Sequence, residues 1–165
     1  MKKLLYLFCA SLLAFTSCSK DDDNNSSDPA TSTLPKKIVS VYSSGTYTST
    51  FTYNGNKIVS KAESDGSKTN YTYTGDVITK TEELDEKGFI ETTTEYTYIG
   101  GKLAVSLEKE VDEDYDTKTV YTYNTDGTVS YADFLMNKTT GALVDDGATV
   151  GTYTFNAGNL VKNVY

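Results

Sequence analysis

From Lys36 onward, apolar and polar residues alternate along the chain, and Gly, Asn or Asp recur at short intervals. Alternation with a period of two is typical of β-strands, and Gly and Asx supply the positive φ angles that tight hairpin turns need. Thr, Tyr and Val dominate this region, and long apolar faces at helical spacing are missing, which favours strands over helices. We therefore expect an all-β domain over residues 36–165.

The same pattern divides the domain into consecutive strands joined by short turns. The strands are expected at 37–42, 47–54, 57–63, 68–74, 76–84, 89–98, 102–110, 117–124, 128–136 and 149–155, with an extra edge strand at 159–165. About ten antiparallel strands in this order form a meander, and the right-handed twist of such a sheet makes it curl. We predict a curled or half-closed sheet; a closed up-and-down β-barrel is the alternative.

Five segments share an aromatic-Thr-aromatic motif that is followed by a short turn and an apolar strand. They begin at Phe51, Tyr71, Tyr96, Tyr121 and Tyr153, so their spacing varies from 20 to 32 residues. The varying spacing indicates a hairpin unit whose outer turn differs in length. The segments resemble the tyrosine-rich YD repeats of Rhs-type secreted shells, in which strand-turn-strand units build a continuous sheet. No segment contains the Tyr-Asp pair itself, so the resemblance implies this architecture alone.

The tyrosines of the motif are expected to share one face of the sheet, because side chains two positions apart on a strand point the same way. This tyrosine row comprises Tyr53, Tyr71, Tyr73, Tyr96, Tyr98, Tyr121 and Tyr123. The rings can form the apolar core through cross-strand ladders, or they can form an exposed platform that stacks on sugar rings or a peptide. The domain has few other large apolar residues, which favours the core; the platform is the alternative.

A different pattern occupies residues 1–17. Lys2 and Lys3 precede a nearly uninterrupted apolar run from Leu4 to Phe15. As a helix this run is about 18 Å long, too short for the ~30 Å apolar core of a bilayer. A positive start, a short apolar run and small residues after it are typical of a secretory signal peptide.

The end of that run indicates the type of signal. The segment Phe15-Thr16-Ser17-Cys18 resembles a bacterial lipobox, in which the cysteine is lipidated and becomes the first residue of the mature chain. The residues that follow it resemble the acidic export signal of Gram-negative surface lipoproteins; they are Ser19, Lys20, Asp21, Asp22 and Asp23. The resemblance implies a lipid anchor on Cys18, in the outer membrane and exposed at the cell surface.

Residues 18–35 separate this cysteine from the predicted sheet. Beyond Cys18 they are mainly Ser, Asp, Asn, Thr and Pro, which cannot bury enough apolar surface to order themselves. We expect a flexible acidic tether that spans roughly 20–25 Å on average.

The composition excludes several kinds of chemistry. The chain has 15 basic and 23 acidic residues; every basic residue is Lys, and His is absent. It therefore has no imidazole base or ligand and no guanidinium clamp for phosphate. We expect no enzymatic activity, no cofactor and, given the acidic balance, no nucleic-acid partner.

One acidic stretch deserves comparison with a metal site. Asp112, Asp114 and Asp116 have the spacing that begins a calcium loop, but Thr117 stands where the loop needs Gly and Tyr123 where it needs Glu. An EF-hand is excluded, and a solvated hairpin tip is expected, with weak calcium binding as the alternative.

The preferred function is a membrane-anchored surface lipoprotein that acts as a non-enzymatic binding, adhesive or scaffold module. Its partners would be the membrane, through Cys18, and a glycan or protein ligand. The alternative is a barrel-like carrier of a glycan or a small apolar molecule.

Overall fold

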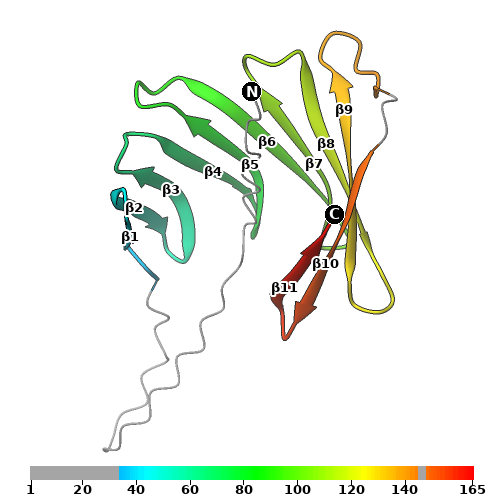
Figure 1. Ribbon diagram of the computed structural model, residues 1–165, viewed down its shortest axis with the longest axis horizontal. Coiled ribbons are helices and arrows are strands. Elements are labelled where there is room, and N and C mark those ends of the chain that lie inside the picture. Colours follow the sequence, from blue (N-terminus) through cyan, green and yellow to red (C-terminus); the bar gives the residue numbers. More distant parts are fainter. Residues whose placement is uncertain (1–33, 145–147) are drawn as a thin grey trace, which may run out of the picture.

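The computed structural model describes residues 34–144 and 148–165, and these form one antiparallel sheet of 11 strands (Figure 1). Neighbours in the sheet are neighbours in the chain, from the first strand to the last. The strands are β1 (Lys37–Tyr42), β2 (Gly45–Asn54), β3 (Lys57–Glu63), β4 (Lys68–Thr74), β5 (Val77–Leu84), β6 (Ile90–Ile99), β7 (Lys102–Glu110), β8 (Tyr115–Tyr123), β9 (Val129–Asn137), β10 (Thr149–Asn156) and β11 (Asn159–Val164). The predicted all-β meander is confirmed. Within these ranges no helix has the length and apolarity needed to cross a membrane.

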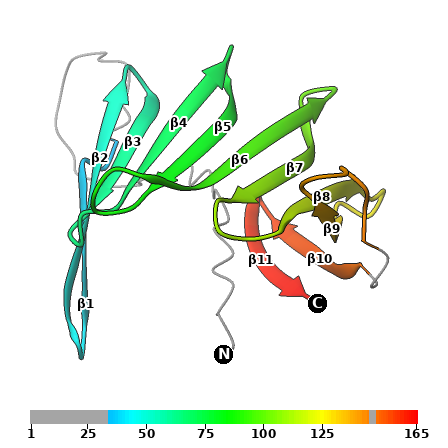
Figure 2. The ribbon, with the colours of Figure 1, turned by 90° about the horizontal axis from the view of Figure 1, so that it is seen from above.

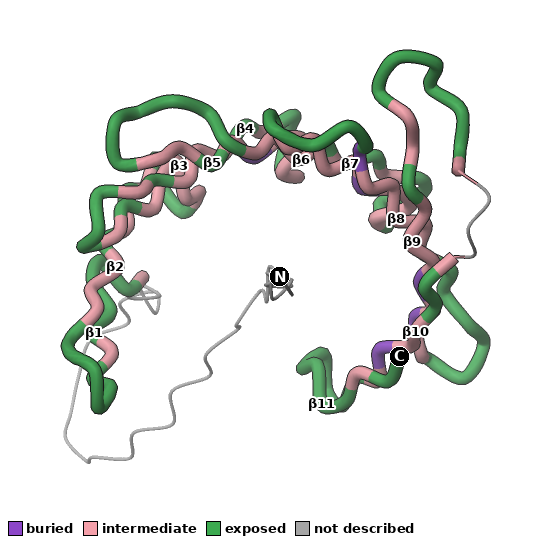
Figure 3. Tube along the Cα trace, turned by 45° about the horizontal axis from the view of Figure 1, so that its top comes forward, coloured by how far each residue is buried: buried purple, intermediate pink, exposed green. Residues whose placement is uncertain are grey.

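The sheet curls but does not close. Its strands follow an open arc in two views (Figures 2 and 3), and β1 and β11 lie at the two ends of that arc. The strand order contains no pairing between β1 and β11. The curled open sheet is therefore the observed form, and the closed barrel that was the alternative is wrong.

The aromatic-Thr-aromatic motif coincides with a β-bulge in four of its five hairpins. The register shifts just after the motif Thr, between Thr52 and Tyr53, Thr72 and Tyr73, Thr97 and Tyr98, and Thr154 and Phe155. The β8–β9 hairpin keeps a regular register through its own motif. Bulges bend a strand and increase its local twist. Their regular placement therefore gives the sheet a source of curvature at almost every second strand.

The single layer leaves very little interior. Among the described side chains none is fully buried, and the buried hydrophobic residues are Val129, Tyr131 and Tyr153, which are 6–8% exposed. The Tyr131 and Tyr153 rings stack with their centroids 4.7 Å apart and their planes 23° apart, and Tyr121 packs beside them. The core of the protein is therefore a small aromatic cluster on β8, β9 and β10.

Gly151 makes room for this cluster. It lies directly opposite Tyr131 in the β9–β10 ladder, and a Cβ atom at Gly151 would stand 2.3 Å from the Tyr131 ring. The ring crosses the backbone of β10 at this point, and its hydroxyl reaches the Asn163 side-chain oxygen on β11 at 3.4 Å. A single tyrosine thus connects three strands, and only a residue without a side chain fits beneath it.

We expect Gly151→Ala to lower the free energy of unfolding by about 1–3 kcal/mol, because the added methyl group would push the Tyr131 ring out of its stack. A double-mutant cycle with Tyr131→Leu, measured by chemical denaturation, tests this cause. Once the ring is absent, Gly151→Ala should cost less than about 0.5 kcal/mol. An equal cost in both backgrounds would contradict the close approach of ring and backbone.

Candidate functional site

The strand register places the whole tyrosine row on one face of the sheet, here called the tyrosine face. Residues directly opposite each other in an antiparallel ladder share a face. Tyr71 lies opposite Thr81, Tyr96 opposite Ser106, and Tyr121 opposite Tyr131. Thr81 on β5 also pairs with Thr94 on β6, and Ser106 on β7 pairs with Thr119 on β8. Thr94 and Thr119 each lie two positions before a tyrosine of the row and so share its face. The same face therefore continues from β4 to β9.

The rings of the row are neither fully buried nor fully exposed to water. Tyr123 is 42% exposed, whereas the other six tyrosines of the row are half-buried. Burial raises the pKa of Tyr71 to about 12. It is also the largest cause of the raised pKa of Tyr73, Tyr98 and Tyr121. These four phenols have therefore lost part of their contact with water, while part of each ring still faces it.

Small hydroxyl residues lie between the rings and bond to them. Thr81 on β5 and Ser106 on β7 are each 8% exposed. The Thr81 hydroxyl shares a hydrogen bond of 3.3 Å with the Tyr96 hydroxyl, and Ser106 does the same with Tyr121 at 3.3 Å. The rings thus lean over a smaller neighbour on the preceding strand. The sequence pattern did not single out Thr81 or Ser106, because their burial depends on which strand each ring leans toward.

Lysines cover two of the rings at the turn end of the row. Lys57 Nζ lies 5.4 Å from the centroid of the Tyr73 ring and forms an ion pair of 2.8 Å with Asp76. Lys102 Nζ lies 4.7 Å from the centroid of the Tyr123 ring. A cation over a ring face is favourable but occupies the face that a sugar or peptide would use. A ligand at this end of the row would have to displace these lysines.

Carboxylates form the other polar element of the tyrosine face. Glu108 on β7 lies opposite Thr94 and Thr117, and Asp133 on β9 accepts a hydrogen bond of 2.8 Å from the Thr119 hydroxyl. Burial raises the pKa of the Glu108 carboxyl, and the negative charges of Glu110, Glu83 and Asp133 raise it further. Glu108 is thus a partly desolvated acid among like charges.

These acids do not amount to a metal centre. Over residues 34–144 and 148–165, no three His, Cys, Asp or Glu side chains are placed to hold an ion. Of the aspartates with calcium-loop spacing, Asp112 and Asp114 are exposed, whereas Asp116 is only 6% exposed. The Asp116 Oδ1 atom accepts no hydrogen bond and lies 3.9 Å from Lys138 Nζ. The Lys138 ammonium is thus the positive group placed to balance this buried carboxylate.

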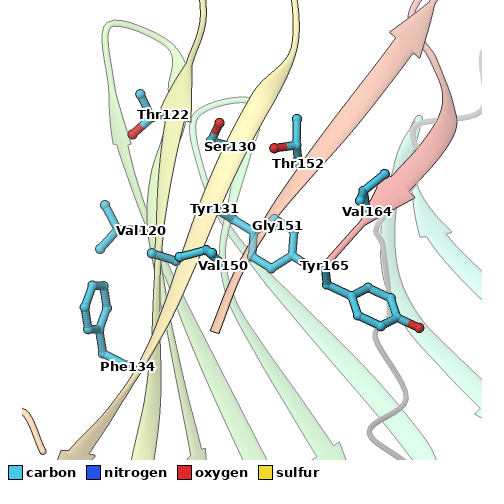
Figure 4. A pocket seen from close by; sticks show the side chains of 11 residues that line it. Val120, Thr122, Ser130, Tyr131, Phe134, Val150, Gly151, Thr152, Val164 and Tyr165 are labelled. Carbon is cyan, nitrogen blue, oxygen red and sulfur yellow. The ribbon is translucent and has the colours of Figure 1, made fainter. Parts of the chain in front are cut away.

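The opposite face carries a feature that the sequence pattern did not reveal. A hollow of about 600 Å³ extends over β8 to β11 (Figure 4). We call it the β8–β11 hollow. Its apolar lining includes Val120, Ala132 and Val150, which form one cross-strand row. The hydroxyl residues Thr122, Ser130 and Thr152 form the adjacent row. The alternation of Val120 with Tyr121 in the sequence predicts that Val120 lies on the face opposite the tyrosines. That Val120 forms a row with Ala132 and Val150 depends on the register of three strands, which the sequence pattern does not give.

The remaining predicted site residues lie outside the described part of the chain. These are the lipidation site Cys18 and the export-signal residues Ser19, Lys20, Asp21, Asp22 and Asp23. The signal peptide over residues 1–17 lies outside it as well.

Comparison with known proteins adds no relative. No protein-family model matches the chain, and neither a curated protein nor a solved structure matches it.

The raised pKa of Glu108 predicts that replacing this residue changes the stability of the protein in a pH-dependent way. An acid whose pKa is higher in the folded protein contributes stability below its unfolded pKa, and this contribution is lost as the pH rises through the folded value. We therefore expect Glu108→Gln to raise the melting temperature at about pH 8 and to change it little at about pH 4.

Glu91→Gln on β6 is the matched control, since Glu91 is exposed. Melting followed by circular dichroism should show no stabilisation of this control at either pH. A Glu108→Gln protein that melts lower than wild type at the higher pH would contradict the unfavourable burial of the charge.

Proposed function

We propose that the protein is a membrane-anchored lipoprotein of the outer membrane, exposed at the cell surface, whose sheet serves as a non-enzymatic binding, adhesive or scaffold module. Cys18 would carry the lipid, and the acidic residues after it would direct the protein to the outside. Residues 18–35 would hold the sheet away from the membrane. Support for the anchor comes from the lipobox and the acidic stretch of the sequence.

The single observation that supports the module is the one-layer construction of the sheet. With no second layer over either face in the described part of the chain, the sheet offers broad open surfaces, one of which is hollowed over β8 to β11. A broad surface suits a chain-like glycan or another protein better than it suits a small substrate. The tyrosine face would contribute the accessible parts of its rings, with Tyr123 the most exposed of the row.

The open sheet also supports the choice of a binding or scaffold module over the alternative, a carrier. A carrier needs an enclosed interior, and the arc of strands encloses none because β1 and β11 do not pair. Of the tyrosines that would line such an interior, Tyr96 and Tyr121 are instead bonded to neighbouring hydroxyls, and Tyr73 and Tyr123 lie under lysines. These contacts favour a scaffold or a binding surface over a carrier.

The anchor and the surface location can be tested together in intact cells by membrane fractionation and digestion with external protease. The wild-type protein should sediment with the outer membrane and be digested. Cys18→Ser should move nearly all of the protein into the soluble fraction, because no acyl chain can be attached. Continued membrane retention of this variant would contradict the anchor.

Replacement of Asp21, Asp22 and Asp23 by Ala tests the export signal in the same assay. This variant should stay in the membrane but resist external protease. Replacement of Asn24, Asn25 and Ser26 by Ala is the matched control, because it changes three tether residues and keeps the acidic stretch. Equal digestion of both triple variants would contradict the role of the aspartates.

A further inference from the structure

The outer edge of β11 has the features of a strand that another strand can extend. β11 pairs with β10 alone, and no described segment covers its other side. Sheet edges are normally protected by charges, Pro or a covering segment, because their free N–H and C=O groups can pair with another chain. β11 contains one charged residue, Lys162, and no Pro, and Val161 and Val164 are 58% and 49% exposed.

The β8–β11 hollow extends this unprotected edge onto one face. Val164 and Tyr165 line the hollow at the edge, and Figure 4 shows the Tyr131 ring between them and Val150. Val150 is 63% exposed and Tyr165 is 89% exposed. A free strand edge therefore adjoins an apolar surface that water still covers. A partner strand along β11 would remove water from both at once.

The charge distribution indicates which partner fits. The chain carries a formal net charge of −8, yet residues 148–165 contain one Lys and no Asp or Glu. Two copies of an acidic protein repel each other over most of their surfaces, but residues 148–165, which form β10 and β11, add none of the acidic charge.

A twofold axis defines how two copies can pair through their β11 strands. Two β11 strands that pair antiparallel about a twofold axis perpendicular to the sheet keep the same face of both copies on the same side. The two hollows then become neighbours, and their apolar residues form one continuous surface across the new ladder. Such an interface is isologous and closes at two copies, so it does not lead to fibres.

We propose that a second copy of this chain binds here, with its β11 strand antiparallel to β11 of the first copy. This property goes beyond the proposed anchoring and does not depend on it. β11 has 6 residues, and a stable interface buries about 800 Å² per partner. A ladder along a strand of this length buries less area than that, so the dimer is weak and its fraction depends on protein concentration.

Sedimentation velocity of the purified full-length chain over a concentration series tests the proposal. The wild-type protein should pass from monomer to dimer, and Val164→Asp should raise the dissociation constant at least about tenfold, because it places two like charges at the interface. Val39→Asp on β1 is the matched control: Val39 is 52% exposed, and its replacement should leave the dimer unchanged. Circular dichroism should show both variants folded.

Three results would overturn the proposal: a wild-type protein that stays monomeric throughout, a dimer weakened by Val39→Asp and not by Val164→Asp, or a series of species larger than the dimer. Disulfide formation gives a second readout if the variant folds poorly. With Cys9 and Cys18 replaced by Ser, single cysteines at positions 160–164 should cross-link two copies at one or more positions, whereas Val39→Cys should not. Cross-linking through Val39→Cys alone would place the interface at β1.

Discussion

The absence of a second layer is the constraint on which the rest of this fold depends. In a sandwich or a barrel, side chains of one sheet are buried by another sheet or by the far wall. Here, within the described residues, the shielding of a side chain comes from its neighbours on the same face of one sheet. Large flat rings suit this task, because a Tyr covers much area, loses little conformational entropy and keeps its hydroxyl at the water boundary.

The distribution of burial follows from this constraint. Thr81 and Ser106 are buried because a ring from the next strand leans over each of them, and the most buried aromatic pair, Tyr131 and Tyr153, stacks where a glycine lets one ring cross a strand. No residue of β1 to β4 or of β11 reaches the same burial (Figure 3). The ends of the arc consequently keep apolar side chains in contact with water, which makes them the natural places for contact with other molecules.

The alternation of side chains was enough to predict the strands, their order and the shared face of the tyrosines, because these depend on a period of two and on turn residues alone. Other features depend on register between strands. The approach of Tyr131 to Gly151, the like charges around Glu108 and the row of Val120 and Val150 each join residues from different strands. The bulge after Thr97 shifts the register between β6 and β7, so an ideal ladder drawn from the sequence would not have placed Glu108 opposite Thr94.

We expect the tyrosine face to supply most of the stability of this sheet, which has almost no interior. The most direct measurement compares Tyr98→Ala with Thr97→Ala by chemical denaturation, since these adjacent residues of β6 lie on opposite faces and Thr97 is exposed. Loss of the half-buried ring should lower the free energy of unfolding by about 2–3 kcal/mol, and loss of the threonine side chain by less than about 1 kcal/mol. Equal costs for the two substitutions would contradict the claim.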